Sequence, residues 1–132
     1  DDLAGLAVAY QAGSLQEFFA ADQCPADITK KPLSTPVDVY LSVQEGKASA
    51  ATVSIAPAQL YIDANPDCGL MVLEEFRFTQ DEETLGTRIG IPKGETELLA
   101  FTNGVIDKLL ESGEYIQWYN AHTALAKELG VE

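Results

Sequence analysis

The chain has 132 residues, of which 46% are hydrophobic and 22% are charged. That length is enough for one domain with a sizeable core, since a chain of about this size buries roughly two-thirds of its unfolded surface. Twenty-one acidic against eight basic residues give a formal net charge of −13. This balance argues against binding to nucleic acid or to anionic membranes, and no apolar run approaches the roughly 20 residues of a membrane span.

Cysteine usage and the start of the chain bear on its compartment. Cys24 and Cys68 fit either one disulfide in an oxidising compartment or two buried thiols. Their expected places on opposite faces of a sheet favour two thiols. Neither cysteine has a CxxC partner and His122 is the only histidine, so the spacing supports no zinc site. The opening Asp1-Asp2 carries no signal peptide, which favours a mature or excised segment over a cytosolic protein.

The first structural signal is a strand that runs through a glycine turn into a helix. Leu6 to Tyr10 is apolar, the residues at 11–14 break the run, and Leu15, Phe18 and Phe19 recur at helical spacing. Unsatisfied N–H groups at the start of such a helix attract a small anion or carboxylate. The alternative is a helix capped by Ser14 with no ligand.

The middle of the chain continues the alternation of strands and helices. In chain order we expect an edge strand over Ile28–Leu33, a helix that begins at Thr35-Pro36 and stops at Gly46, a central strand over Ala48–Ile55, and a helix opened by Pro57 and ended by Asn65. Within the first of these helices, Val37, Tyr40 and Leu41 are expected to face the core.

The last third predicts two more strands and two long helices. The strands are Leu70–Leu73 and Leu85–Ile91, and the helices are Glu95–Glu111 and the stretch from Tyr115 to the end, separated by Ser112-Gly113. The order of elements predicts an α/β fold, a mostly parallel doubly wound sheet with helices on both faces. We expect an α/β domain over residues 1–91 and a helical pair over residues 92–132.

With these elements in place, the chain resembles the solute-binding proteins of amino-acid ABC importers, which have the type II periplasmic-binding fold. The resemblance is carried by Gly90, Lys93-Gly94, Glu97-Leu98-Leu99, Asn103, Gly113-Glu114-Tyr115 and Trp118-Tyr119. The opening residues 2–19 are similar to the start of the family's second lobe, and the Gly-Lys-Ala turn at 46–48 matches the segment before its central strand.

The resemblance implies one lobe of a two-lobed clamp, together with the C-terminal tail. The missing first lobe would supply the arginine that holds the ligand carboxylate, so the lobe alone should bind its small, polar, amino-acid-like solute weakly. The implied partner is the membrane permease of an ABC importer. The implied location is extracytoplasmic, in the periplasm or as a cell-surface lipoprotein.

Family positions that contact the ligand fall on Gln11, Gly13, Ser14, Leu15 and Ser54 of this sequence. Two of them depart from the family pattern. Ser54 stands where the family has an aspartate that pairs with the ligand amino group, and Leu15 stands where a hydroxyl is usual. Losing the carboxylate removes a charge-assisted hydrogen bond worth about 1.5–3 kcal/mol, which weakens the case for an α-amino-acid ligand.

Other function classes have less support. The sequence has no Gly-x-Ser-x-Gly elbow, no metal-ligand cluster and no locally supported Cys–His or Ser–His pair. We therefore expect no enzyme activity, no catalytic residues and no cofactor. The alternative function is a degenerate binding-protein-like domain that acts as a sensor or protein-interaction module without a small-molecule ligand. A homo-oligomer through the terminal helices is a further expectation, because their apolar stripes form a large surface.

Overall fold

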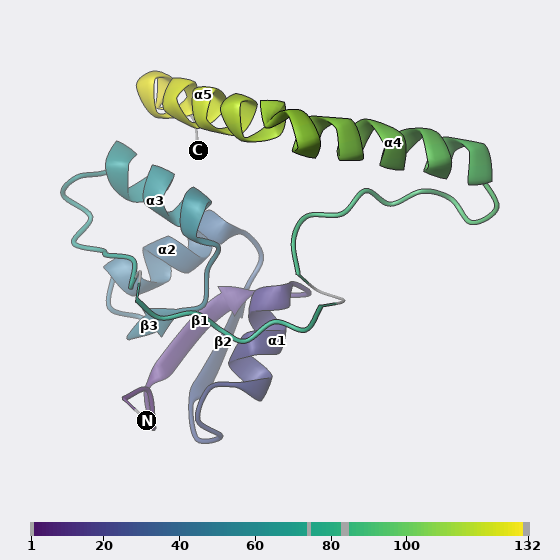
Figure 1. The fold of residues 1–132 in the computed structure, drawn as a ribbon. Coiled ribbons are helices and arrows are strands. Elements are labelled where there is room, and N and C mark those ends of the chain that lie inside the picture. Colours follow the sequence, from purple (N-terminus) through teal and green to yellow (C-terminus); the bar gives the residue numbers. More distant parts are fainter. Residues whose placement is uncertain (1, 74, 83–84, 131–132) are drawn as a thin grey trace. The chain divides into compact units, whose positions relative to one another are not determined.

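The computed structural model describes residues 2–73, 75–82 and 85–130 (Figure 1). Its elements are, in chain order, β1 (Ala7–Gln11), α1 (Leu15–Asp22), β2 (Thr29–Leu33), α2 (Pro36–Gln44), β3 (Ala50–Ala51), α3 (Ile55–Ala64), α4 (Thr96–Ser112) and α5 (Glu114–Leu129). The chain divides into two compact units: the first comprises the described residues up to Phe78 together with Gly130, and the second comprises Thr79–Leu129. The expected division after residue 91, into an α/β domain and a helical pair, stays a prediction.

The first unit contains a parallel sheet with the strand order β2-β1-β3. In this sheet Val8 of β1 is paired with Lys30 of β2 and with Ala50 of β3. The expected α/β class and the edge position of β2 are confirmed for the described residues. An edge strand also accommodates Pro32, which has no N–H to give to a second neighbour.

Alternate side chains of β1 enter core clusters on the two faces of the sheet. Val8 packs with Ala20 of α1, whereas Ala9 packs with Val39 of α2. The two helices therefore cover opposite faces, as right-handed crossovers require when β2 and β3 lie on either side of β1. A third cluster, built on Tyr40, joins α2 to α3.

The start of α2 follows the local sequence signals. Pro36 occupies its first turn, and the Thr35 hydroxyl accepts a hydrogen bond from the Asp38 N–H at 3.1 Å. The helix was expected to bury Val37 and Leu41, and that part of the prediction is wrong because both side chains are exposed. Tyr40 is buried as expected, and Val39 is buried as well, because α2 packs on the sheet and also carries the side chains that meet α3.

The strand predicted over Ala48–Ile55 is much shorter than expected. Only Ala50–Ala51 pairs, and it lies at an edge of the described sheet rather than at its centre. The reason is that the chain turns at Ser54 into α3, whose first residue is Ile55.

The strands predicted over 70–73 and 85–91 are absent from the described residues. Leu70 and Val72 pack against the core cluster of α2 and α3, while Met71 and Leu73 are 77% and 67% exposed. The side chains thus alternate as in a strand, but the segment has no ladder partner. The second segment lies in a unit with no described strand to pair with.

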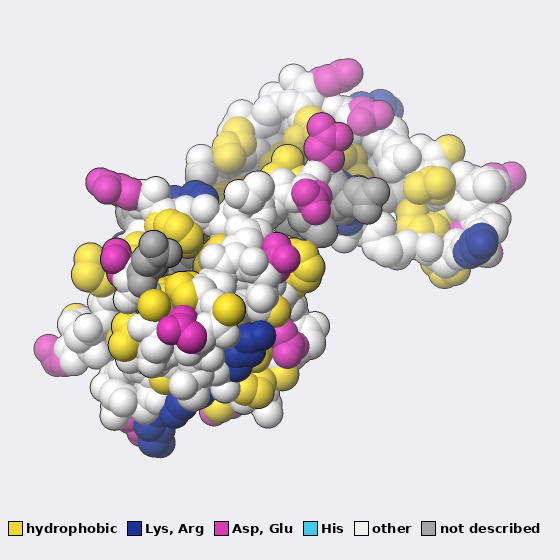
Figure 2. All heavy atoms as spheres, turned by 90° about the horizontal axis from the view of Figure 1, so that it is seen from below, with side chains coloured by type: hydrophobic (Ala, Val, Ile, Leu, Met, Phe, Trp, Pro, Cys, Tyr) yellow, Lys and Arg dark blue, Asp and Glu magenta, His cyan; other side chains and the backbone are white. Residues whose placement is uncertain are grey.

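The second unit consists mainly of α4 and α5. They are separated by Gly113, whose φ of 72° ends α4 in the left-handed conformation and confirms the predicted break. No residue of either helix is buried, and Trp118 is 52% exposed. Hydrophobic side chains also reach the surface between scattered Asp and Glu side chains on the face seen in Figure 2.

The two cysteines are free thiols, as their expected places in the fold indicate. Cys24 packs against the core cluster on the α1 side of the sheet, and Cys68 belongs to the cluster of α2 and α3. Within the described residues, no helix combines the length and the apolar character that crossing a bilayer requires.

The inward face of α2 can be tested with two identical truncations on one helix. Val39 is 1% exposed and Val37 is 38% exposed. Val39→Ala removes buried methyl groups and leaves a cavity, so it should lower the free energy of unfolding by about 2 kcal/mol. Val37→Ala is the matched control and should cost less than about 0.5 kcal/mol. If both variants lowered the free energy of unfolding in urea by the same amount, the burial of Val39 against the sheet would be contradicted.

Candidate functional site

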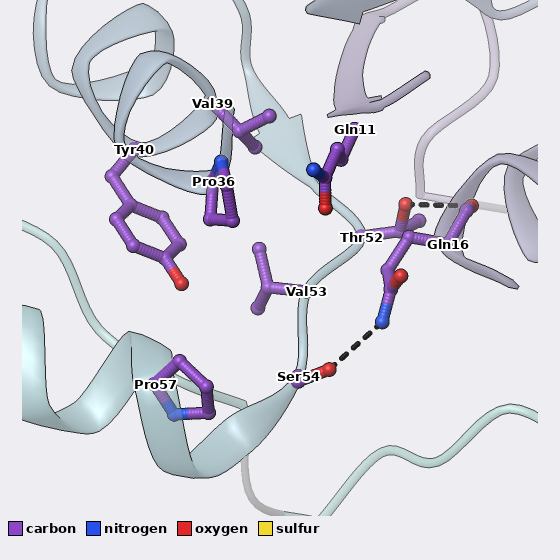
Figure 3. A pocket seen from close by; sticks show the side chains of 9 residues that line it. All are labelled: Gln11, Gln16, Pro36, Val39, Tyr40, Thr52, Val53, Ser54 and Pro57. Atoms are coloured by element: carbon purple, nitrogen blue, oxygen red, sulfur yellow. Dashed lines mark hydrogen bonds between the residues drawn. The ribbon is translucent and has the colours of Figure 1, made fainter. Parts of the chain in front are cut away.

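The candidate site lies at the carboxyl ends of β1 and β3. From there β1 leads into α1 on one face of the sheet, and β3 leads into α3, which packs with α2 on the other face. Ligands of open α/β sheets bind in the crevice at such a switch point. A small open pocket of about 70 Å³ lies here (Figure 3), and it is lined by Gln11, Gln16, Pro36, Val39, Tyr40, Thr52, Val53, Ser54 and Pro57.

Two of the five predicted ligand-binding residues line this pocket. Gln11 ends β1, and Ser54 occupies the N-cap position of α3, so parallel strand pairing brings them to the same edge of the sheet. Gly13, Ser14 and Leu15 are not among the lining residues. They form the turn into α1 and its first residue, with Gly13 exposed and the other two half-buried.

The backbone at Gly13 has an intramolecular partner. Its N–H donates to the Glu17 carboxylate oxygen Oε2 at 2.7 Å, so this amide does not await an external anion. Glycine is required here by conformation, because φ is +71°. A Cβ at this position would meet no atom within 4 Å, so close approach of another group is not the reason.

Ser14 is placed as predicted but makes a different hydrogen bond. It holds the N-cap position of α1, yet its side chain accepts no hydrogen bond from the helix. Its hydroxyl instead donates to the Gln11 carbonyl oxygen at 2.6 Å. The hydroxyl thereby links the end of β1 to the start of α1, and the side-chain cap, one of two roles considered for Ser14, is not formed.

Polar side chains connect the two sides of the pocket. The Gln16 side-chain amide donates to the Ser54 hydroxyl oxygen at 2.8 Å, and the Thr52 hydroxyl donates to the Gln16 carbonyl oxygen at 2.9 Å (Figure 3). The amide of Gln11 donates to the Ser34 carbonyl oxygen at 3.3 Å. The two Gln16 contacts tie the start of α1 to the segment that follows β3, and the Gln11 contact ties the end of β1 to the residue that follows β2.

Sequence reasoning missed the α2 side of the pocket. Pro36, Val39 and Tyr40 lie in the first turns of α2, which follows β2. Since all three strands are parallel, the helix after β2 also begins at the carboxyl edge of the sheet. That rule was sufficient to place the first turn of α2 beside Gln11 and Ser54 once the strand order was known.

No side chain that lines the pocket is charged. Among the described residues there is also no group of three His, Cys, Asp or Glu side chains that could hold a metal ion. The pocket therefore offers amide and hydroxyl groups beside an apolar wall formed by prolines and valines. Such a surface can bind and orient a polar molecule by hydrogen bonds.

Comparison of the chain with models of known protein families, with curated proteins and with solved structures finds no match. The resemblance to solute-binding proteins consequently rests on the residues quoted for it and stays a prediction.

Tyr10 lies in the core on the α1 side of the sheet, and its hydroxyl is sensitive to the nearby Glu17 carboxylate. Burial, and in second place the Glu17 carboxylate, raise the pKa of the Tyr10 hydroxyl above its usual value of about 10. The folded protein then holds this proton more tightly than the unfolded chain. The free energy of unfolding is unaffected by Tyr10 at pH values below the unfolded-state pKa of about 10. It falls as the pH rises from there through the folded-state pKa.

We expect Tyr10→Phe to remove part of this alkaline loss of stability. The measurement is the free energy of unfolding in urea at a series of pH values from neutral to strongly alkaline. The variant should show a shallower decline than the parent protein above about pH 10. Parallel declines would contradict the environment described for Tyr10.

Proposed function

We propose that the first unit is one half of a two-lobed clamp that binds a small polar solute outside the cytoplasm and delivers it to the permease of an ABC importer. The observation that carries this proposal is the pocket at the switch point, where Gln11 and Ser54 meet. These two positions correspond to ligand contacts in the family that the sequence resembles. The finer assignment, a lobe of the type II periplasmic-binding fold, belongs to the same proposal.

The size of the pocket supports a half-site rather than a complete one. Pockets that enclose drug-sized ligands have volumes of roughly 300–1,000 Å³, whereas this one measures about 70 Å³. A solute resting here would stay open to solvent on one side. A second lobe that closes over the solute would supply the remaining contacts, as in hinge closure of periplasmic binding proteins.

The chain alone should therefore bind solutes only in the millimolar range. We expect no measurable heat in calorimetric titrations with a panel of amino acids and short oligopeptides. A millimolar solute mixture should nevertheless shift the amide resonances of Gln11, Gln16 and Ser54 in a ¹⁵N NMR spectrum. A micromolar dissociation constant would contradict the half-site, and an unchanged spectrum would contradict solute binding altogether.

A second candidate function, a protein-interaction module, is favoured by the helical unit. Its large apolar side chains are exposed to solvent: Phe101 is 71% exposed, and Val105 and Trp118 are also exposed. Exposed apolar patches of this kind mark interaction sites. In the two-lobed clamp the first lobe would cover this surface, and for the 132-residue chain studied by itself we propose that a second copy of the chain does so.

Self-association can be measured by sedimentation velocity over a range of concentrations. The chain should form dimers or larger species, and the double variant Val105→Ser, Trp118→Ser should shift it toward monomer because it removes apolar contact area. The double variant Asn103→Ser, Gln117→Ser changes exposed polar residues of the same two helices and should leave association unchanged. A parent protein that stays monomeric at high concentration would contradict this proposal.

A further inference from the structure

The chemical class of the ligand is indicated by the charge pattern of the pocket. Every group that lines the pocket is neutral, although the chain carries a formal net charge of −13. The polar groups are the two glutamine amides and the hydroxyls of Ser54, Thr52 and Tyr40. Amides and hydroxyls both donate and accept hydrogen bonds, so they match a ligand that does the same.

A ligand ammonium group would have no counter-ion among these side chains. Moving a cation out of water is costly unless it gains a charged partner or several acceptors. The position that holds an aspartate in the resembled family is occupied here by Ser54, whose hydroxyl oxygen already accepts the Gln16 amide at 2.8 Å. The Ser54 hydroxyl oxygen could accept one further hydrogen bond from an amino group, but an ammonium would gain no carboxylate there.

A ligand carboxylate would also find one of its expected partners in this unit, the Gly13 N–H, already bound. The turn before α1 is where an anion would meet backbone N–H groups. The Gly13 N–H is instead bound to the Glu17 carboxylate at 2.7 Å. An incoming anion would have to displace this carboxylate and would be repelled by it.

The geometry points to an uncharged polar solute, with hydroxyl or amide groups on one side and an apolar face on the other, rather than a zwitterionic amino acid. The apolar face would lie against Pro36, Val53 and Pro57. This inference rests on the proposed solute-binding function and names the class of its ligand. The hydrogen bonds of Thr52 and Gln16 hold the polar groups in place before the ligand arrives, so little side-chain conformational entropy is lost on binding.

The test is a ¹⁵N NMR titration of the full chain with four probes: D-xylose, propionamide, L-alanine and L-glutamate. The first two should shift the side-chain amide signals of Gln11 and Gln16 at millimolar concentration. The two amino acids should require at least tenfold higher concentrations for the same shift, because their ammonium groups gain no counter-ion.

A variant with a charged pocket should reverse the order in which the probes bind. Ser54→Asp introduces a carboxylate at the pocket and should strengthen L-alanine binding about tenfold, the effect of a favourable interaction of about 1.4 kcal/mol, while weakening the response to D-xylose. Ser49→Asp is the matched control, since it adds the same charge at an exposed serine before the opposite end of β3 and should leave the order of probes unchanged.

The outcomes separate this inference from the proposed function. Binding of L-alanine at the pocket as strong as that of D-xylose or propionamide would overturn the inference and leave solute binding supported. An unchanged spectrum with all four probes would overturn the proposed function, and the inference with it. A response to the neutral probes alone, reversed by Ser54→Asp but not by Ser49→Asp, supports both.

Discussion

The parallel pairing of β1 on both of its sides is the constraint on which the rest of the first unit depends. The Leu6, Ala7 and Ala9 carbonyl oxygens accept backbone hydrogen bonds at 2.8–3.0 Å from residues that belong to or flank β2 and β3. Because parallel strands need right-handed crossovers, this order puts α1 and α2 on opposite faces and brings three strand ends to one edge. The pocket is lined by residues that end or follow these strands.

Features specified by a single residue could be predicted from the sequence, whereas strands that need a distant partner could not. Thr35 and Pro36 begin α2, and Gly113 ends α4, through chemistry contained in each residue. The runs at 70–73 and 85–91 have the apolar character of strands, but a strand forms only where another backbone offers free N–H and C=O groups. β3, with two paired residues, offers too short an edge for the first run.

The site was predictable to the same extent. Gln11 and Ser54, two positions taken from the family resemblance, both line the pocket, whereas the turn amides were expected to face a ligand and Gly13, Ser14 and Leu15 do not line it. The spacing of Ser14 and Glu17 is that of a capping box, in which a glutamate returns to a backbone N–H before the helix. Here Glu17 reaches the Gly13 N–H. This spacing was in the sequence, although the observed bond reaches Gly13 rather than the N-cap residue Ser14, and the Ser14 side chain accepts no hydrogen bond from the helix in return.

The neutral lining of the pocket is itself informative about how the site would work. An open surface site can keep a charged group hydrated, whereas a site that is covered on binding must remove water from every group that lines it. Unpaired charges make that step costly, while amides and hydroxyls with fixed partners, such as Gln16 and Ser54, lose far less. The chain is strongly acidic, yet no carboxylate lines this pocket, and Glu17 is bound to the Gly13 N–H; covering such a lining would therefore remove water from no unpaired charge.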